Sequence, residues 1–398
     1  MSLTLNIKQR NKVLTRMAEL VVSEKTSILD ANKKDFESYK GDDLAMADRL
    51  KVDDAKIEAM LLSLQQLASQ PDPLGVERFE FTHENGIHIS NKTAPFGTVC
   101  IIYESRPDVT IEAAGIAFKS GNKILLKGGK ESLHSNLALV NLWHKALEEN
   151  NCTKNWITYL EFNREQTQEF LQNPTQKIDL IVPRGGEKLI AFVKKYATCP
   201  VIISGRGNNF AYVETEADLE MAIAIIINAK TTKISACNAL DKVLIAADIP
   251  RKHEFLNRLI HELKKNNVAI LTDTFLSDIE GITVLQNETV WFEEFLDYKI
   301  VIGQVATIEE AITKINTYGG GHSAVIITEN SEKAALFMEA VDSAAVYQNT
   351  STRFTDGFQF GLGGELAIST DKLHQRGPIG LQHLVTNKWY ITGNGQIR

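Results

Sequence analysis

Apolar residues recur with a helical period in the first seventy positions of the chain. The apolar positions between Val13 and Val21 fall at i, i+1, i+4, i+7 and i+8, which places them on one face of a helix. A second helix is predicted over 53–70, where Pro71 and Pro73 end it. The charged stretch 32–35 predicts a solvated helix face.

The period changes between residues 78 and 92. Asn85-Gly86 lies between Phe79 and Phe81 on one side and Ile87 and Ile89 on the other. Asn-Gly flanked by alternating apolar residues is the strongest short-range signal for a β-hairpin. Because an isolated hairpin is marginally stable, this one is expected to lean on another subunit or domain.

From residue 96 onward, short apolar runs alternate with amphipathic stretches, which predicts an α/β fold with parallel strands covered by helices on both faces. Up to residue 230 the predicted strands are 99–103, 123–127, 156–160, 179–182, 201–203 and 210–213. The predicted helices of this part are 108–119, 131–150, 187–197 and 218–229.

A second alternation follows residue 237, so a domain boundary is expected near residue 231. Its predicted strands are 243–246, 268–271, 282–285, 299–302, 324–328 and 345–348. Its predicted helices are 251–265, 308–316 and 332–340. The segment 353–398 is Gly-rich and irregular, and a final strand is predicted over 388–392.

Composition narrows the class of protein. The 398 residues exceed one ordinary core, so two or more domains are expected. The net charge of −7 argues against nucleic acid or an anionic membrane as the main partner. Four cysteines without a CxxC spacing argue against a disulfide framework and a structural metal site. A cytoplasmic protein without a signal peptide or membrane span is expected.

Cys237 is the first candidate for chemistry. It lies between Ala236 and Asn238, in a polar turn that joins a predicted helix to a predicted strand. Backbone N–H groups at such a junction can lower the pKa of a thiol and make it a nucleophile. The alternative is that Cys237 is a small buried hydrophobe, as free cysteines commonly are.

Three glycine turns are candidates for binding phosphate. They are Lys127-Gly128-Gly129-Lys130, Pro183-Arg184-Gly185-Gly186 and Ser204-Gly205-Arg206-Gly207-Asn208. Glycine lets the backbone approach a ligand, and a following helix offers N–H donors. None completes a P-loop or GxGxxG pattern, so each also fits a plain turn. His322, after three glycines, fits either a solvated turn or a substrate contact.

Taken together, several multi-residue stretches resemble the gamma-glutamyl phosphate reductase (glutamate-5-semialdehyde dehydrogenase) family of the aldehyde dehydrogenase superfamily. The resemblance runs from the first helices to Arg398. It rests on the stretches 95–98, 102–107, 119–122, 127–129, 179–186, 236–240, 341–347, 351–357, 361–365, 374–378 and 393–398.

The resemblance implies a Rossmann-type cofactor domain over 1–230, a catalytic domain over 231–357 and a return to the cofactor domain over 358–398. The hairpin 78–95 and the C-terminal strand would form an oligomerisation flap. A homo-oligomer is therefore expected, and association with glutamate 5-kinase is left open.

The resemblance also implies residue roles. Cys237 is the expected nucleophile, Lys127 contacts the adenosine ribose, and Gly185 and Gly186 lie at the pyrophosphate of NADPH. Gly128, Pro183 and Arg184 complete the expected cofactor turns. Glu294 is the expected contact to the other ribose, although Glu293 is not separable from it.

One departure from the wider superfamily is informative. Hydrolytic aldehyde dehydrogenases carry a glutamate base before a Gly-Gly, whereas the stretch 201–208 here has no carboxylate. The expected reaction is therefore reduction of L-glutamyl 5-phosphate to glutamate 5-semialdehyde through a Cys237 thioester, a step of proline biosynthesis. A hydrolytic aldehyde dehydrogenase and a non-catalytic binding protein of the same fold are the alternatives.

The reaction requires an oxyanion donor and cations that face an anionic substrate. The Cys237 N–H and the side chain of Asn238 or Arg106 are the expected donors. The expected substrate contacts are Arg106, Arg353, Lys233, Ser351, Thr352 and His322.

Overall fold

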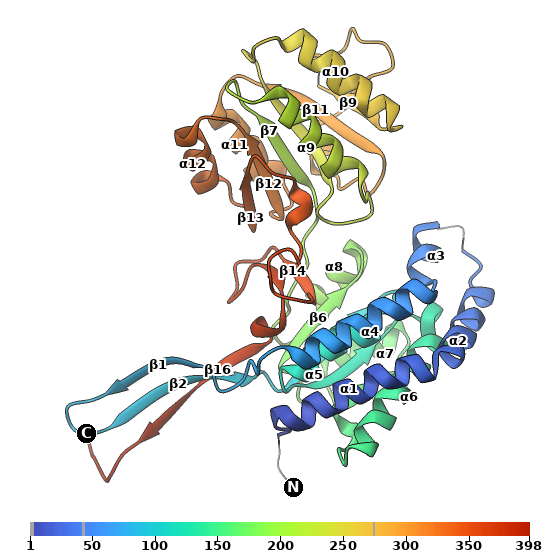
Figure 1. Cartoon of the computed structure of the whole chain (residues 1–398), viewed down its shortest axis with the longest axis vertical. Coiled ribbons are helices and arrows are strands. Elements are labelled where there is room, and N and C mark those ends of the chain that lie inside the picture. The colour runs from blue at the N-terminus through green and yellow to red at the C-terminus, as the bar shows by residue number, and fades with distance from the viewer. Residues whose placement is uncertain (1–3, 42–43, 274) are drawn as a thin grey trace. The chain divides into compact units, whose positions relative to one another are not determined.

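The computed structural model describes residues 4–41, 44–273 and 275–398, and the chain forms two compact units (Figure 1). Unit 1 comprises Met1–Ile203, Gly361–Ala367 and Ile379–Arg398, and unit 2 comprises Ser204–Phe360 and Ile368–Pro378. The boundary expected near residue 231 therefore lies at residue 204. The reason is that strand β7 (Asn209–Val213) hydrogen-bonds between two strands of the unit 2 sheet. The segment 358–398, which was expected to return to the first domain, does so only in part, because Ile368–Pro378 belongs to unit 2.

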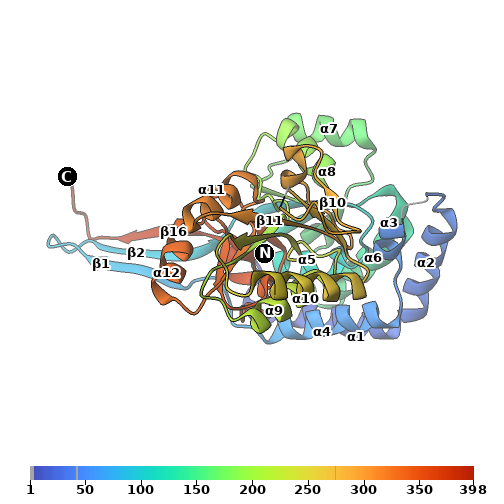
Figure 2. The ribbon, with the colours of Figure 1, turned by 90° about the horizontal axis from the view of Figure 1, so that it is seen from above.

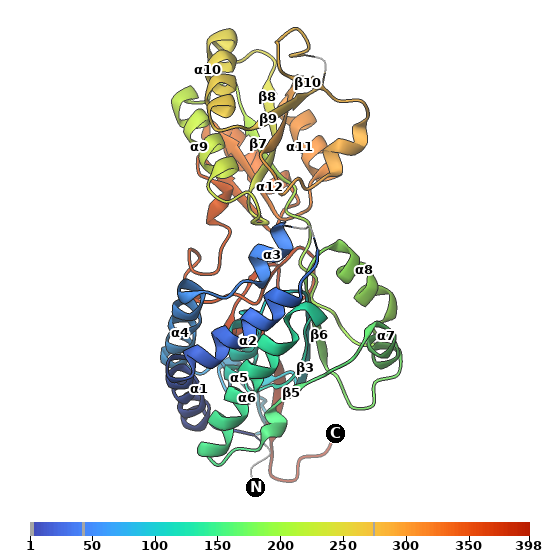
Figure 3. The ribbon, with the colours of Figure 1, turned by 90° about the vertical axis from the view of Figure 1, so that its right-hand side faces the viewer.

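Unit 1 is built on a parallel sheet with the strand order β5-β4-β3-β6. Figure 3 shows α7 and α8 on one side of these strands and the other helices of the unit on the opposite side. The strands are β3 (Thr98–Tyr103), β4 (Lys123–Lys127), β5 (Ile157–Tyr159) and β6 (Leu180–Arg184). The helices are α1 (Ile7–Ser23), α2 (Lys25–Ser38), α3 (Leu44–Leu50), α4 (Asp54–Ser69), α5 (Val109–Lys119), α6 (Leu133–Glu149), α7 (Arg164–Gln172) and α8 (Glu187–Tyr196).

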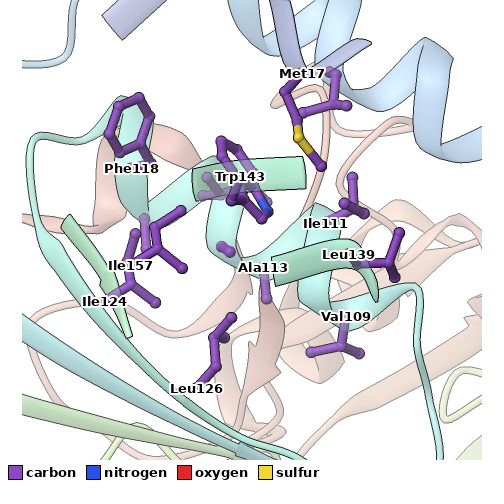
Figure 4. Close-up of a cluster of buried hydrophobic side chains, with 14 of the residues drawn as sticks. Met17, Val109, Ile111, Ala113, Phe118, Ile124, Leu126, Leu139, Trp143 and Ile157 are labelled. Carbon is purple, nitrogen blue, oxygen red and sulfur yellow. The ribbon is translucent and has the colours of Figure 1, made fainter. Parts of the chain in front are cut away.

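Alternate residues of β3 bury into two different cores. Val99 and Ile101 pack with the helices α1, α4, α5 and α6, whereas Cys100 and Ile102 pack with residues of α7 and α8. Figure 4 shows the first core, where Trp143 lies among Met17, Phe118 and the strand residues Ile124 and Leu126. The continuous apolar run of β3 thus reflects a strand covered on both faces.

Two parts of the predicted pattern are wrong. The segment 201–203 contributes one bridge, from Val201 to Ile181, instead of a strand. Helix α7 was not predicted, because its own sequence is mostly polar and shows only a weak apolar period.

The stretch 32–35 is only partly the predicted solvated face, because Lys33 and Lys34 are exposed whereas Asn32 and Asp35 are buried. The Asp35 carboxylate accepts hydrogen bonds from the backbone N–H groups of His134, at 3.0 Å, and Ser135, at 2.7 Å. These are donors of the first turn of α6, so a carboxylate from α2 caps α6.

The predicted hairpin is present and gains a third strand. Strands β1 (Glu77–Thr82), β2 (His88–Pro95) and β16 (Val385–Thr392) form an antiparallel sheet in the order β1-β2-β16. Figure 2 shows this three-stranded ribbon extending away from α1 and α4 of the same unit. The ribbon is named the flap below.

Unit 2 contains a parallel seven-stranded sheet with the order β10-β9-β11-β8-β7-β12-β13. In Figure 1, α9 and α10 lie beside one face of this sheet and α11 and α12 beside the other. Its strands, besides β7, are β8 (Leu240–Ala246), β9 (Ala269–Thr272), β10 (Thr283–Val284), β11 (Lys299–Val305), β12 (Ser323–Ile327) and β13 (Ala345–Gln348). Its helices are α9 (Leu219–Thr231), α10 (Lys252–Lys265), α11 (Ile308–Tyr318) and α12 (Ser331–Ala340).

The remaining segments are short. Strands β14 (Ala367–Ser369) and β15 (Gly377–Ile379) pair with each other. The 3₁₀ turns are η1 (Lys130–Ser132), η2 (Lys154–Trp156), η3 (Glu288–Phe292), η4 (Thr352–Phe354) and η5 (Leu381–His383). Within the described ranges, no helix is both long and apolar enough to cross a membrane. The described residues also contain no group of three or more His, Cys, Asp and Glu suited to a metal ion.

Candidate active site

Cys237 lies in a tight turn between α9 and β8 and is half-buried. Backbone hydrogen bonds from Ala236 to the Lys233 oxygen, at 3.2 Å, and from Ala239 to the Ala236 oxygen, at 3.0 Å, form the turn. The strand after Cys237 begins at Leu240, three residues earlier than predicted. The turn therefore fixes Cys237 against the amino end of β8.

Asn209, the first residue of β7, holds this turn in place. Its side-chain amide nitrogen lies 2.8 Å from the Cys237 oxygen and 2.7 Å from the Ala239 oxygen. Its side-chain oxygen accepts a hydrogen bond from the Ser323 N–H at 3.0 Å. One buried amide thus joins the turn to the starts of β7 and β12. Apart from the position of Asn209 after a glycine-rich stretch, no sequence pattern indicates this role.

The stretch from Ser204 to Asn208 packs directly against the Cys237 turn. A Cβ atom added at Gly207 would lie 1.8 Å from the Cys237 carbonyl oxygen, so only glycine fits there. A Cβ added at Gly320 would lie 2.0 Å from the Arg206 oxygen. The third glycine turn of the sequence therefore supports Cys237, and packing accounts for its glycines without a phosphate.

The side chain of Asn238 is not positioned as an oxyanion donor. Its amide nitrogen donates to the carbonyl oxygens of Arg353, at 3.2 Å, and Thr355, at 3.0 Å. An amide group has two N–H donors, and both are used here. The Thr352 hydroxyl donates to the Asn238 carbonyl at 2.8 Å, so this buried threonine also holds backbone. These two residues tie the 352–355 segment to the residue after Cys237.

Arg353 presents a guanidinium group with unsatisfied donors. Its Nε and Nη1 atoms are buried and have no hydrogen-bond partner among the described residues. Burial lowers the pKa of Arg353, and attraction from Cys237 and Asp356 offsets part of that effect. A buried guanidinium with free N–H groups is suited to bind a carboxylate or phosphate. Arg353 is therefore the best-placed of the predicted substrate contacts.

His322 is fully buried, so neither the solvated turn nor a direct substrate contact fits the structure. Its Nδ1 lies 2.8 Å from the Ser323 hydroxyl, which in turn lies 2.6 Å from the Thr355 hydroxyl. Burial lowers the pKa of His322 to about 4, so the ring is neutral at pH 7. Ser351 is also buried, and its hydroxyl accepts a hydrogen bond from the Arg353 N–H. Both residues support the 351–355 segment.

Two further predicted residues of unit 2, Lys233 and Glu294, lie outside the 351–355 segment. Lys233 is exposed in the loop that follows α9. Glu294 is half-buried in the segment between η3 and β11, whereas the neighbouring Glu293 is exposed. Because Glu294 is more buried than Glu293, its side chain has less freedom, which favours Glu294 over Glu293 for the predicted ribose contact.

In unit 1, the strand order creates a switch point between β3 and β6, because β4 lies on one side of β3 and β6 on the other. Ligands of open α/β sheets bind outside the carboxyl ends of the strands at such a point. Gly185 and Gly186 lie there, exposed, between β6 and α8. The Glu104 carboxylate accepts a hydrogen bond from the Gly186 N–H at 3.0 Å. The first turn of α8 therefore already attracts an anion.

The other residues of the β6 turn differ in exposure. Pro183 is buried within β6, opposite Ile102 of β3, and so contributes to packing. Arg184 is half-buried at the end of the same strand.

The Lys127 turn is only partly as predicted. Lys127 is half-buried at the carboxyl end of β4, and its amine donates to the Gly128 oxygen at 2.8 Å. Burial lowers the pKa of Lys127. Gly128 is buried, and a Cβ there would lie 2.2 Å from the Asn136 side chain, so packing requires this glycine. The N-terminus of α6 cannot bind a phosphate as it stands, because Asp35 occupies it.

Arg106 belongs to unit 1, where it follows β3, and is half-buried. Cys237, Arg353 and Glu294 belong to unit 2. Unit 2 thus contains Cys237, the residues that support its turn and the guanidinium of Arg353, whereas unit 1 contains the switch-point glycines and Lys127.

We expect Cys237 to react with iodoacetamide before the other three cysteines. Alkylation requires an accessible thiolate, and burial raises the pKa of Cys152, Cys199 and Cys100, the last to about 12. Mass spectrometry at pH 8 should show one fast labelling phase that is lost in Cys237→Ser and kept in Cys199→Ser. A fast phase that survives in Cys237→Ser would contradict the assignment.

Comparison with known proteins agrees with this arrangement. The model of the aldehyde dehydrogenase family matches residues 3–275. Gamma-glutamyl phosphate reductase of Clostridium beijerinckii is 42% identical over 397 residues, which cover 98% of this chain and 94% of the relative. The enzyme of that name from Francisella philomiragia is 42% identical over 396 residues, with 99% and 95% covered.

A solved structure gives the same result. The crystal structure of gamma-glutamyl phosphate reductase from Thermotoga maritima superposes with a TM-score of 0.94 at 38% identity, covering 99% of this chain and 95% of that one. The acetylating aldehyde dehydrogenase of Geobacillus thermoglucosidasius shares the fold alone, at 15% identity and a TM-score of 0.71 over 99% of this chain and 93% of that one. The chain therefore belongs to the aldehyde dehydrogenase family and, within it, to the gamma-glutamyl phosphate reductases.

Proposed function

We propose that this chain reduces L-glutamyl 5-phosphate to L-glutamate 5-semialdehyde, with release of phosphate, through a thioester on Cys237. The observation that carries this proposal is the contact between Gly207 and the Cys237 turn. The stretch that packs on the nucleophile, Ser204 to Asn208, contains no carboxylate. Without a general base in that stretch, water is poorly activated to attack a thioester. The thioester then persists until it is reduced.

The residues of unit 2 supply the covalent chemistry. The Cys237 thiolate attacks the acyl carbon, the bond to the phosphate oxygen breaks, and phosphate leaves with that electron pair. The backbone N–H of Cys237 stabilises the developing oxyanion. Arg353 binds an anionic end of the substrate through its buried Nε and Nη1 donors. When the thiohemiacetal collapses, the aldehyde is released and the Cys237 thiolate is restored.

The residues of unit 1 fit a nicotinamide dinucleotide. Gly185 and Gly186 are exposed at the switch point and allow close approach of a pyrophosphate to the backbone. Lys127 ends β4, the strand on the other side of β3, and suits the ribose and 2′-phosphate of NADPH. Arg184 adds positive charge beside the glycines, and Glu294 of unit 2 would accept hydrogen bonds from the second ribose. When bound, NADPH supplies the hydride that reduces the thioester.

Arg106 is retained in this proposal as a cation for the substrate, and Lys233 as a second one near the nucleophile. The substrate is an acyl phosphate, so an enzyme that phosphorylates glutamate must supply it. Glutamate 5-kinase is the proposed partner, and the cytoplasm is the proposed location.

The reverse reaction tests the proposal. We expect glutamate 5-semialdehyde to reduce NADP⁺ only when inorganic phosphate is present, because phosphate must attack the thioester. Absorbance of NADPH should show this phosphate dependence in the native chain. Cys237→Ala should lose more than about a thousandfold in rate, as expected for loss of a nucleophile, whereas Cys199→Ala should keep the native rate.

Two outcomes would contradict it. Steady turnover at the same rate without phosphate would identify water as the acyl acceptor and the enzyme as a hydrolytic dehydrogenase. Full activity of Cys237→Ala would show that another group is the nucleophile.

We further propose that the flap binds a second copy of the chain. Phe79 and Trp389 lie opposite Asn91 of the middle strand, while Phe81 and Ile391 lie opposite Ile89. Their side chains therefore share one face, and the rings of Phe79 and Trp389 are 5.8 Å apart. The four outer residues are 47–61% exposed. An exposed apolar face on a sheet with two open edges is unfavourable in water and favours association.

Charge placed on this face should weaken the assembly. We expect Ile391→Lys to shift the mass measured by light scattering toward the monomer, because a lysine would have to be buried in the interface. Thr392→Lys, one residue along β16 and on the other face, is the matched control and should keep the native mass. An unchanged mass in Ile391→Lys would exclude this face as the interface.

A further inference from the structure

The segment that carries Glu294 is held by two buried, charged residues of β8. The Lys242 amine donates to the carbonyl oxygen of Glu293 at 2.7 Å. The Asp241 carboxylate accepts a hydrogen bond from the Phe295 N–H at 3.0 Å. These two bonds fasten the backbone immediately before and immediately after Glu294. Asp241 and Lys242 are 2% and 0% exposed, so the side-chain partner in each contact is buried, whereas the backbone segment that they hold is only partly covered.

A cluster of lysines surrounds the same segment. The Lys242 amine lies 3.9 Å from the centre of the Phe295 ring, and the Lys299 amine lies 4.6 Å from it. Lys230 of α9 pairs with the other oxygen of Asp241 at 2.9 Å, and this pair is also buried. Asp241 is thus itself fixed, and cation–π contacts hold the Phe295 ring.

Packing alone does not account for these charges. Burial of ionised groups costs free energy, and apolar residues of similar size often stabilise a core as well or better. Here the buried charges are directed at the two backbone groups that flank one half-buried carboxylate. This arrangement limits where the Glu294 side chain can lie.

We propose that Asp241 and Lys242 are positioning residues that fix Glu294 for its contact with the nicotinamide-side ribose. The inference rests on the proposed function, which assigns that contact to Glu294. It links the nucleophile to the cofactor contact, because Asp241 and Lys242 follow Cys237 by only four and five residues in the same turn and strand. The strand that is anchored beside the thiol therefore also sets the position of the carboxylate.

The charge state of Lys242 gives a distinctive signature. Burial lowers the pKa of Lys242 to about 7, with Lys230 and Lys299 acting in the same direction and Asp241 and Glu293 acting against it. The charged amine, which is the stronger donor and the one that attracts the ring, is present below pH 7 and lost above it. Positioning of Glu294 should weaken as the pH rises through this value.

A double-mutant cycle tests the inference. We expect Lys242→Met to raise the Kd for NADPH, measured by fluorescence titration without substrate, and the KM for NADPH by about 5- to 10-fold each while kcat changes little. Glu294→Gln should raise the same KM, and adding Lys242→Met to it should cause no further increase, since Lys242 acts through Glu294. Lys264→Met is the matched control, because the Lys264 amine also donates to a backbone oxygen, that of Glu280 at 2.7 Å, outside the 293–295 segment, and it should keep the native KM. Asp241→Asn provides the same cycle if Lys242→Met does not fold.

The pH dependence adds a second readout. In the native chain the KM for NADPH should rise between pH 6 and pH 8, and Lys242→Met should flatten this rise. Additive effects in the cycle, or an unchanged KM in folded Lys242→Met and Asp241→Asn, would overturn the inference. An unchanged KM in Glu294→Gln would overturn it together with the ribose assignment, while phosphate-dependent turnover of the native chain would show that the reaction itself stands.

Discussion

The organisation of the catalytic unit depends on the side-chain amide of Asn209. It connects the turn of Cys237 with the starts of β7 and β12, so one buried residue holds these two strands and the Cys237 turn together. Gly207 can pack against the Cys237 carbonyl only because that turn is fixed. The close approach excludes a side chain at residue 207 and gives the thiol a neighbour without a carboxylate. In the proposed mechanism, slow hydrolysis of the thioester would follow from this packing as well as from residue identity.

A second constraint is that charged side chains form hydrogen bonds with backbone N–H and C=O groups at the ends of helices and in loops. Asp35 caps α6, Asp241 and Lys242 hold the 293–295 segment, and Glu104 contacts the start of α8. In each case a charged side chain far along the sequence satisfies a backbone group. Arg353 differs, because two of its buried donors have no partner among the described residues. We therefore propose that Arg353 binds an external anion.

Local pattern predicted the elements well and their distant contacts poorly. Periodicity and turn chemistry were sufficient for the strands of both sheets, the Asn85-Gly86 hairpin and the junction at Cys237. The strand 201–203 was wrong, because this segment makes only one bridge to Ile181 of β6. The boundary near 231 was wrong, because β7 pairs with β12 and β8 of the unit 2 sheet. The structural roles of Asn238 and Thr352 could not be predicted from local sequence, since these two residues contact each other across 114 residues. The burial of Asp35 was missed for the same reason, because its partners lie about a hundred residues away.

The account stands on a thioester at Cys237 that water does not remove. Its most direct test is the intact mass of the chain after glutamate 5-semialdehyde and NADP⁺ are mixed with it in the absence of phosphate and quenched in acid. The account predicts one equivalent of NADPH and a mass increase of one glutamyl group, which peptide mapping assigns to Cys237 and which added phosphate removes. Continuous NADPH formation with an unmodified Cys237 would contradict it.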